Sequence, residues 1–258
     1  MHTLKEIAVD RRGKLAGLFA HHKRMRIMIE AVLEGQFGTA LADAEDEPRL
    51  AQLSIKGIFH MFGGDPQHPL AHEMLRNLPL SFVLLDSDAW RKLLFQIYGE
   101  RVQKQARTAL SSAELDSDRL HSFVQRVSAD FQVQRINVDI ARRIASDLET
   151  KVVLHLFRSE EDLVERGVGF AALSGQRVVC VATSAVICTR GIEIQIMTHP
   201  DFRRRGLATA TGAALISYCL ERNLEPEWDA ENDTSVKLAE KLGYVRPEPY
   251  DGIIVIPG

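Results

Sequence analysis

The sequence contains few cysteines, and their spacing suits neither a metal site nor a disulfide framework. Its 258 residues include three, Cys180, Cys188 and Cys219, with no CxxC pair. An odd number without paired spacing argues against zinc binding and against a domain stapled by disulfides. The nine histidines also lack the HExxH spacing of a helical zinc site. We therefore expect no metal, and we expect reduced thiols in a cytoplasmic protein.

Long apolar runs and a strong net charge are absent as well. No stretch of about 18 apolar residues occurs, so we expect no membrane-spanning helix. Residues 1–30 are interrupted by charge throughout, which argues against a signal peptide. The formal net charge is −3, whereas general nucleic-acid binders are usually basic. We expect neither a membrane nor a nucleic acid as a partner, and the sequence leaves an oligomer open.

The composition is that of a globular protein, and the chain is long enough for two domains. Hydrophobic residues make up 45% and charged residues 26% of the chain, which is ordinary for folded domains. The hydrophobic pattern restarts near Ser128, so we predict an N-terminal α/β domain over 1–127 and a second domain over 128–258. In the first domain the patterns predict one or two helices over 4–34 and further helices after Asp65, over 87–98 and over 118–127, with strands over 51–61 and 80–85. The segment HHKRMR (21–26) is typical of a solvated helix face.

The second domain shows a clearer order of elements. The patterns predict strand 131–136, helix 138–148, helix 159–166, strands 167–173, 177–186 and 192–198, a long helix to about 222, strand 225–229, helix 232–242 and strand 252–256. Antiparallel strands are thus followed by strand, helix, strand, helix and strand.

Three consecutive arginines, Arg203, Arg204 and Arg205, precede Gly206 between the third of those strands and the long helix. A helix N-terminus exposes unpaired N–H groups and roughly half a positive charge, so it binds phosphate readily. Gly206 lets the main chain approach a ligand closely, and the small Ala208 keeps the first helical turn open. These residues suit a pyrophosphate cradle, although a solvated charge run would have the same local composition. Neither GxGxxG nor GxxxxGK[ST] occurs.

At this turn the sequence resembles a known family. Arg203-x-x-Gly206-x-Ala208 fits the [Q/R]xxGx[G/A] cofactor loop of GNAT-type N-acetyltransferases. WDAENDTSVKLAEKLGY (228–244) is similar to that superfamily's second cofactor motif, an asparagine followed by a helix that ends in LGF or LGY. DLVERGVGFAAL and GIEIQIMT resemble the two-domain group that includes zwittermicin-resistance-like acetyltransferases.

The resemblance implies a fold and a cosubstrate. The fold is α/β (α+β): a mixed, mostly antiparallel GNAT sheet with a V-shaped splay over about 128–258, preceded by a domain that covers the acceptor site. The cosubstrate is acetyl-CoA, with its diphosphate on the main-chain amides of 204–209 and its pantetheine paired like an added strand between the splayed strands. The implied cofactor-binding residues are Ile196, Met197, Thr198, Arg203, Arg204, Arg205, Gly206, Leu207, Ala208, Thr209, Asn232 and Ser235. For Asn232 the alternative is a plain helix N-cap.

The resemblance also implies an acidic side chain at this position of the strand, which is Glu193. We expect the Glu193 carboxylate to be the general base. This residue is a carboxylate in an otherwise apolar strand, and partial burial suits it to taking a proton from the attacking amine. The alternative is a surface glutamate on a solvated sheet face. The thioester oxygen gains negative charge in the transition state, and we expect a strand N–H, that of Met197, to donate to it. Ala239 occupies the helical position where many relatives carry a tyrosine, so we assign no general acid.

The predicted function is an acetyl-CoA-dependent N-acetyltransferase acting on the primary amine of a small molecule. The alternative is a catalytically silent acyl-CoA-binding sensor or interaction module, which Ala239 favours and Glu193 opposes. Of the other conspicuous residues, His199 is interpreted as a turn residue, Trp228 as core and Cys219 as helix packing.

Overall fold

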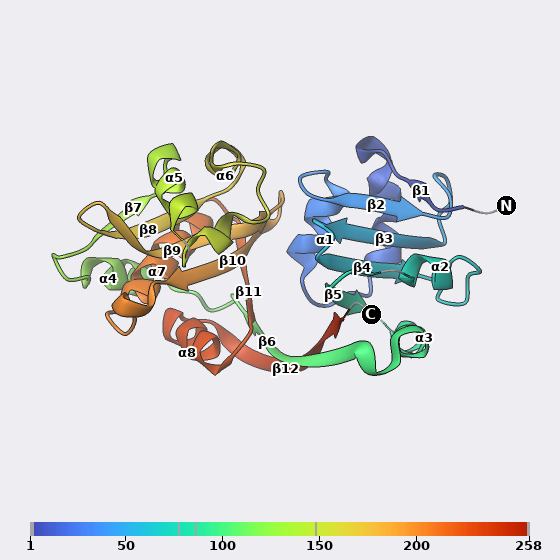
Figure 1. Ribbon diagram of the computed structural model, residues 1–258. Helices are drawn as coiled ribbons and strands as arrows, with labels where there is room; N and C mark the ends of the chain where they lie inside the picture. Colours follow the sequence, from blue (N-terminus) through green and yellow to red (C-terminus); the bar gives the residue numbers. More distant parts are fainter. Residues whose placement is uncertain (1–2, 77, 86, 148, 257–258) are drawn as a thin grey trace. The chain divides into compact units, whose positions relative to one another are not determined.

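The chain divides into two compact units (Figure 1). The structure is a computed structural model that describes residues 3–76, 78–85, 87–147 and 149–256. One unit comprises Met1–Arg107 and Pro249–Gly258, and the other comprises Thr108–Glu248. This division differs from the predicted boundary between residues 127 and 128, because 108–127 belong to the second unit and the end of the chain returns to the first.

The first unit is built on a sheet with strand order β1-β2-β3-β4-β5-β12, antiparallel except for the parallel pair β4–β5. Its elements are β1 (Lys5–Glu6), η1 (Val9–Phe19), α1 (Arg26–Leu33), β2 (Thr39–Ala42), β3 (Leu50–Ile55), β4 (Phe59–Gly64), α2 (Ala71–Leu75), β5 (Ser81–Leu85), α3 (Asp88–Tyr98) and η2 (Gly99–Arg101). Trp90 of α3 is completely buried against Phe62, and its indole nitrogen donates to the Gly64 carbonyl at 3.0 Å. Two strands, β6 (Val102–Ser111) and β12 (Val245–Val255), run from one unit into the other.

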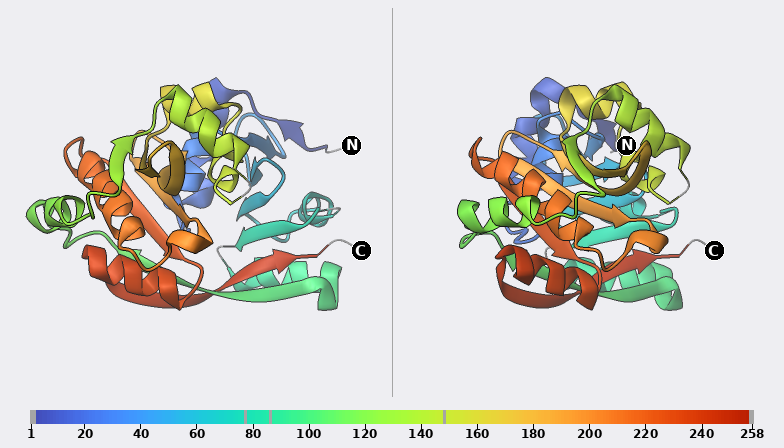
Figure 2. Two further views of the ribbon diagram at one scale, coloured as in Figure 1. Left: turned by 60° about the vertical axis from the view of Figure 1, so that its left-hand side comes forward. Right: turned by 90° about the vertical axis from the view of Figure 1, so that its left-hand side faces the viewer.

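The second unit has strand order β6-β11-β10-β9-β8-β7, in which only β10–β11 is parallel among the described pairs. Its elements are α4 (Ser117–Gln125), β7 (Gln132–Arg135), α5 (Val138–Ser146), η3 (Lys151–Leu154), α6 (Glu160–Arg166), β8 (Gly169–Ser174), β9 (Arg177–Ile187), β10 (Gly191–Thr198), η4 (Pro200–Phe202), α7 (Leu207–Leu220), β11 (Glu225–Ala230) and α8 (Asp233–Leu242). Helix α7 packs along the sheet from β8 to β11 (Figure 2). The mixed, mostly antiparallel α/β fold predicted from the sequence is therefore confirmed.

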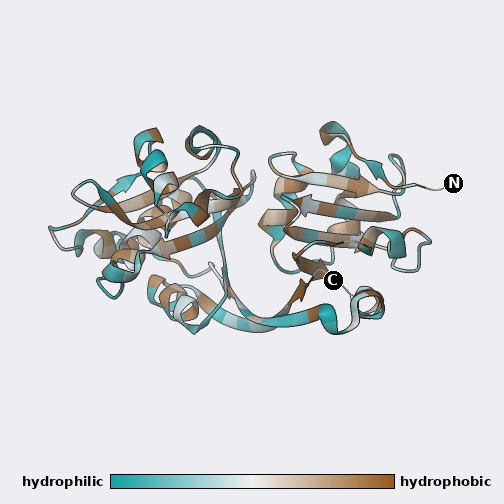
Figure 3. Ribbon diagram, viewed as in Figure 1, coloured by the Kyte–Doolittle hydropathy of each residue, from teal (hydrophilic) through white to brown (hydrophobic). Residues whose placement is uncertain are grey.

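Several predicted elements differ from the observed ones. The predicted strand 51–61 is a hairpin, β3–β4, which turns at Lys56 and Gly57, both with positive φ. Strand β6 was not predicted because its sequence, VQKQARTALS, is mostly polar, as its hydrophilic colouring in Figure 3 shows. The predicted helix 138–148 ends at Ser146, and its predicted last residue, 148, lies outside the described residues.

The prediction of one or two helices over 4–34 is confirmed in part, since η1 and α1 lie in this range, but the prediction that HHKRMR is a solvated helix face is wrong. Residues 21–25 form the loop between η1 and α1. Within this loop His22 is only 7% exposed, and its Nε2 lies 2.9 Å from the Phe62 carbonyl oxygen. In the described part of the chain, none of the helices combines the length and the apolar composition that a bilayer crossing requires.

Candidate active site

The start of α7 lacks the side-chain cap that most other helices have. Helices α3, α4, α5, α6 and α8 each begin with a side chain that accepts a hydrogen bond from the first turn. Helix α7 begins instead at Gly206, whose φ is +79°, with no side-chain cap. A Cβ at Gly206 would meet no atom within 4 Å. The first N–H groups of α7 are therefore available to an outside acceptor, with open space around them.

The three arginines before Gly206 are all exposed, but their environments differ. Arg203 folds back, and its Nε donates to the Thr198 carbonyl at 3.3 Å. Arg205 stacks on the Phe202 ring, with its guanidinium carbon 5.2 Å from the ring centroid. Arg204 has a left-handed backbone, with φ of 62°. Left-handed residues at 204 and 206 curve the turn so that its amides line a concavity of the kind that binds anions.

Strands β10 and β11 separate halfway along their length. They pair in parallel at Gly191–Glu225, Ile192–Pro226 and Glu193–Glu227. Beyond that point β10 is paired with β9 through Thr198, whereas β11 is paired with β6. An irregularity in the β9–β10 register falls at the same place, between Glu193 and Ile194. The splay predicted between these two strands is therefore present.

The main-chain groups of β10 alternate between its two sides. Just beyond its C-terminal end, the N–H of His199 donates to the Val179 carbonyl of β9 at 2.9 Å. Just before its start, the carbonyl of Arg190 accepts from the N–H of Glu225 in β11 at 3.0 Å. Since the hydrogen-bonding groups of successive strand residues point to opposite sides, odd-numbered residues face β9 and even-numbered residues face β11.

This alternation shows that one predicted main-chain contact is wrong. Ile196 and Thr198 direct their N–H and C=O groups toward the splay, as a strand-like ligand would require, and the Thr198 carbonyl there also accepts the hydrogen bond from Arg203. The amide of Met197 points toward β9 instead, where Met197 pairs with Val181. Met197 was predicted as the amide donor because the pattern GIEIQIMT shows which side chains alternate but not which main-chain groups face the open side.

Glu193 lies at the point where the strands separate. It is 8% exposed, so the expectation of burial is confirmed and the alternative of a solvated surface glutamate is not. The even-numbered neighbours Ile192, Ile194 and Ile196 pack in the cluster that includes Leu215 of α7. Glu193 is therefore on the opposite face of β10 from that helix. A carboxylate so placed can accept a proton from a group held at the splay.

A hydrogen-bonded thiol connects the end of β10 to α7, and no local sequence pattern predicted it. The Cys180 sulfur lies 3.1 Å from the Thr198 hydroxyl oxygen and 3.3 Å from that of Thr211. The Thr211 hydroxyl also donates to the Leu207 carbonyl at 3.0 Å. Burial raises the pKa of the Cys180 thiol above its ordinary value, so the thiol stays protonated at neutral pH and acts as a structural link.

Asn232 is the N-cap of α8. Its Oδ1 accepts from the Ser235 amide at 3.0 Å, which is the structural role anticipated as the alternative. The side chain is exposed, and its NH₂ group is chemically able to donate to a ligand at the same time. The Ser235 hydroxyl accepts from the Trp228 indole at 3.1 Å, and Trp228 is 5% exposed, so its predicted core position is confirmed.

The Tyr244 hydroxyl is not placed to give a proton to a leaving thiolate. Tyr244 is 2% exposed, packs on Trp228, and donates to the Pro226 carbonyl at 2.8 Å. Burial, followed by the charges of neighbouring groups that include Glu193, raises its pKa well above the ordinary value. Ala239 is completely buried in the same cluster. The position at which many relatives carry a tyrosine is thus filled by core packing.

Two substitutions at Asn232 separate its possible roles. In Asn232→Asp the carboxylate keeps the cap, so we expect an unfolding free energy close to that of the original protein. In Asn232→Ala the cap is lost, and we expect about 1 kcal/mol of destabilisation. If the amide also binds the cosubstrate, both variants weaken coenzyme A binding, whereas a purely structural cap predicts that the Asp variant binds normally. Thermal melts and calorimetric titrations measure the two effects.

A splayed parallel strand pair, followed by a glycine-led helix with an uncapped N-terminus, defines a domain of the acyltransferase type that GNAT proteins share. Comparison with known proteins leads to the same class of protein. A sequence model of the GNAT acetyltransferase family matches residues 16–253. The chain belongs to the GNAT acetyltransferase family, and it is an acyltransferase of the N-acetyltransferase type.

Individual relatives are similar over most of the chain. The uncharacterized N-acetyltransferase YdfB of Bacillus subtilis (strain 168) is 23% identical over 255 residues, which is 95% of each chain. The crystal structure of a GCN5-related N-acetyltransferase-like protein from Streptococcus suis 89/1591 is 28% identical, with a TM-score of 0.80 over 95% of this chain and 98% of that one. A tandem GNAT protein from the clavulanic acid biosynthesis pathway, at 14% identity, has the same fold, with a TM-score of 0.60 over 98% of this chain and 96% of that one.

Proposed function

We propose that this enzyme uses acetyl-CoA and transfers the acetyl group to the primary amine of a small molecule. The observation that carries the proposal is the uncapped start of α7, where the first-turn amides adjoin left-handed Gly206 and three exposed arginines. An anion with two phosphates meets several N–H donors and a favourable helix dipole there. The family assignment supports the same cosubstrate.

The splay supplies the path for the rest of the cosubstrate. The main-chain groups of Ile196 and Thr198 face the gap that opens between β10 and β11 beyond Glu193. A pantetheine arm contains two amides, which can pair with an exposed strand in the manner of β-augmentation. Of the predicted binding residues, we assign these two main-chain contacts, together with the amides of Leu207, Ala208 and Thr209, to the cosubstrate. Asn232 adds the side-chain contact tested above.

The chemistry is attack by the amine nitrogen on the thioester carbonyl carbon. A C–N bond forms, the C–S bond breaks, and coenzyme A leaves as the thiolate. An alkyl amine is mostly protonated at neutral pH, so one proton must be removed before attack, and Glu193 accepts it directly or through a water molecule. After attack the nitrogen is positively charged, and its second proton passes to solvent as the tetrahedral intermediate collapses to the amide. The carbonyl oxygen becomes negative in the transition state, and the amide of Ile196 or Thr198 replaces that of Met197 as the donor that stabilises it.

The leaving group requires no tyrosine in this scheme. A free thiol has a pKa of about 8.5, so its anion is a moderately stable product at neutral pH. With Ala239 and Tyr244 both buried, we assign no general acid, and the thiolate takes its proton from solvent.

The test is single-turnover release of coenzyme A thiol with a panel of amines that differ in charge and size. We expect release, and an acetylated product of matching mass, with at least one small primary amine. Binding of acetyl-CoA without release for any acceptor would support the silent sensor instead. Failure to bind coenzyme A would contradict the cosubstrate assignment itself.

A further inference from the structure

Four exposed arginines lie around the turn before α7, namely Arg177, Arg203, Arg204 and Arg205. Within the described residues, none of the four lies within ion-pair distance of a carboxylate. Asp201, which is in the turn itself, lies 3.6 Å from the His199 ring instead. The positive charge at this turn is therefore not neutralised by an acidic partner in the protein, and an anion is favoured there.

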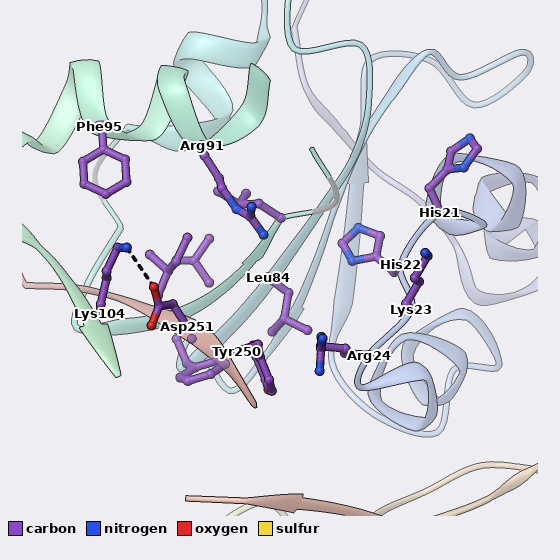
Figure 4. Close-up of a pocket in the computed structure, with 15 residues that line it drawn as sticks. His21, His22, Lys23, Arg24, Leu84, Arg91, Phe95, Lys104, Tyr250 and Asp251 are labelled. Atoms are coloured by element: carbon purple, nitrogen blue, oxygen red, sulfur yellow. Dashed lines mark hydrogen bonds and ion pairs between the residues drawn. The ribbon is translucent and has the colours of Figure 1, made fainter. Parts of the chain in front are cut away.

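The cations of the first unit are arranged differently. A cavity of about 430 Å³ in that unit is also lined by basic side chains, as Figure 4 shows. Of these, Lys104 lies 2.8 Å from Asp251, and Arg91 lies 3.2 Å from Asp88. Carboxylates of the protein thus neutralise part of the positive charge in that cavity, unlike the charge at the turn before α7.

Arg177 reaches the turn from a neighbouring strand. It is the first residue of β9, which runs antiparallel to β10, so the start of β9 lies beside the end of β10. Its Nη2 donates to His199 Nε2 at 2.6 Å. A guanidinium can only donate, and an imidazole nitrogen can accept only when the ring is neutral. This bond therefore holds Arg177 beside the turn without neutralising its charge.

Phe202 supports two of the four arginines. The guanidinium carbon of Arg177 lies 5.4 Å from the centroid of the Phe202 ring, and that of Arg205 lies 5.2 Å from it. The ring makes edge contacts with Phe131 and His199, whose centroids are 6.1 Å and 5.9 Å away. Two guanidinium groups thus share one packed aromatic ring, and their N–H groups are the kind of donor that pairs with phosphate oxygens.

Coenzyme A carries a second phosphorylated group close to its diphosphate. The 3′-phosphate is a monoester, with a charge of about −1.5 to −2 at neutral pH. A single ribose ring separates it from the diphosphate. When the first amides of α7 hold the diphosphate, the 3′-phosphate is within reach of arginines that flank the same turn.

We propose that Arg177 and Arg205, which share the Phe202 ring, bind the 3′-phosphate and select coenzyme A over its 3′-dephospho form. The proposal rests on the proposed use of acetyl-CoA, and it concerns a part of the cosubstrate that the α7 amides do not hold. Paired hydrogen bonds from a guanidinium to phosphate oxygens provide the selectivity. Arg177 is a new binding residue in this proposal, because the arginine–glycine motif does not include it.

The test compares coenzyme A with 3′-dephospho-coenzyme A in calorimetric titrations. We expect the dephospho form to bind about tenfold more weakly, or weaker still, because it lacks the charge-assisted hydrogen bonds to the monoester. Equal affinities of the two ligands would overturn this proposal and leave the proposed function intact. Failure of both ligands to bind would overturn the proposed cosubstrate, and this proposal with it.

The variant Arg177→Met assigns the selectivity to the start of β9. Methionine keeps an apolar contact with the Phe202 ring and removes only the charged group from an exposed position. Its affinity for coenzyme A should fall about tenfold, whereas its affinity for the dephospho form should stay within about twofold. Such a non-additive pair of losses indicates a direct contact. An equal loss for both ligands would refute contact between Arg177 and the 3′-phosphate.

The matched control is Arg222→Met. Arg222 also stacks on an aromatic ring, 3.8 Å from the centroid of Tyr218, but it lies beyond the C-terminal end of α7. This variant removes the same charge from the same kind of contact, so its affinity for both ligands should be unchanged. If Arg222→Met weakened coenzyme A binding as much as Arg177→Met does, the effect would come from net charge and the assignment to the turn would be wrong.

Discussion

Replacing Glu193 with glutamine should lower kcat for acetyl transfer by about 10²–10⁴-fold, the usual contribution of a positioned general base. Glutamine has nearly the same shape, so it keeps the packing of a side chain that is 8% exposed. It cannot accept a proton from the attacking ammonium. The affinity for coenzyme A should stay within a factor of two, because Glu193 binds no part of the cosubstrate in this account. Steady-state kinetics and calorimetry separate the two quantities.

The pH dependence of the rate gives a second test of the general-base role of Glu193. The rate of Glu193→Gln should rise as the pH approaches about 10, where the amine loses its proton without help. The matched control is Glu225→Gln in the neighbouring strand, whose carboxylate is 43% exposed and paired with Arg190 at 2.6 Å. That variant should retain the original kcat. A kcat for Glu193→Gln within threefold of the original would exclude a general-base role.

A single proline tests whether main-chain groups hold the diphosphate. Ala208→Pro removes one N–H from the first turn of α7, where proline is tolerated because that N–H has no partner within the helix. Loss of one charge-assisted hydrogen bond, about 1.5–3 kcal/mol, should raise the Kd for coenzyme A about tenfold or more. Calorimetric titration measures the change.

Ala208→Val is the matched control for this proline. It adds a side chain of similar bulk at a half-buried position and keeps the N–H. We expect its affinity for coenzyme A to lie close to that of the original protein, with both variants folded by circular dichroism. Equal weakening by valine and proline would show that bulk, not the amide, is responsible, and an unaffected proline variant would remove Ala208 from the phosphate site.

The sequence was most informative where one local pattern carries both structure and chemistry. The arginine–glycine turn, the Asn232 cap and the apolar alternation of β10 were each visible in fewer than about 20 residues, because capping, left-handed glycine and strand alternation are local properties. The burial of Glu193 followed from the same alternation. The direction of the Met197 amide did not, since it depends on which strand pairs with which side of β10.

Features that depend on distant segments were not predicted. Strand β6 is polar, and it was recognised only through its pairing with β11. The loop 21–24 looked like an exposed helix face because its partners, Phe62 and Tyr250, are far away in the sequence. The link from Cys180 to Thr198 and Thr211 likewise joins three separate elements. No local pattern contains these contacts, so they became visible only in three dimensions.

The central claim is that the amides at the start of α7 hold the diphosphate of coenzyme A. The most direct measurement is the change in ¹⁵N–¹H resonances of Gly206, Leu207, Ala208 and Thr209 on titration with coenzyme A, compared with pantetheine, which lacks the diphosphate. We expect large saturable shifts at these amides with coenzyme A and none with pantetheine. Unchanged resonances with coenzyme A, or equal shifts with pantetheine, would contradict it.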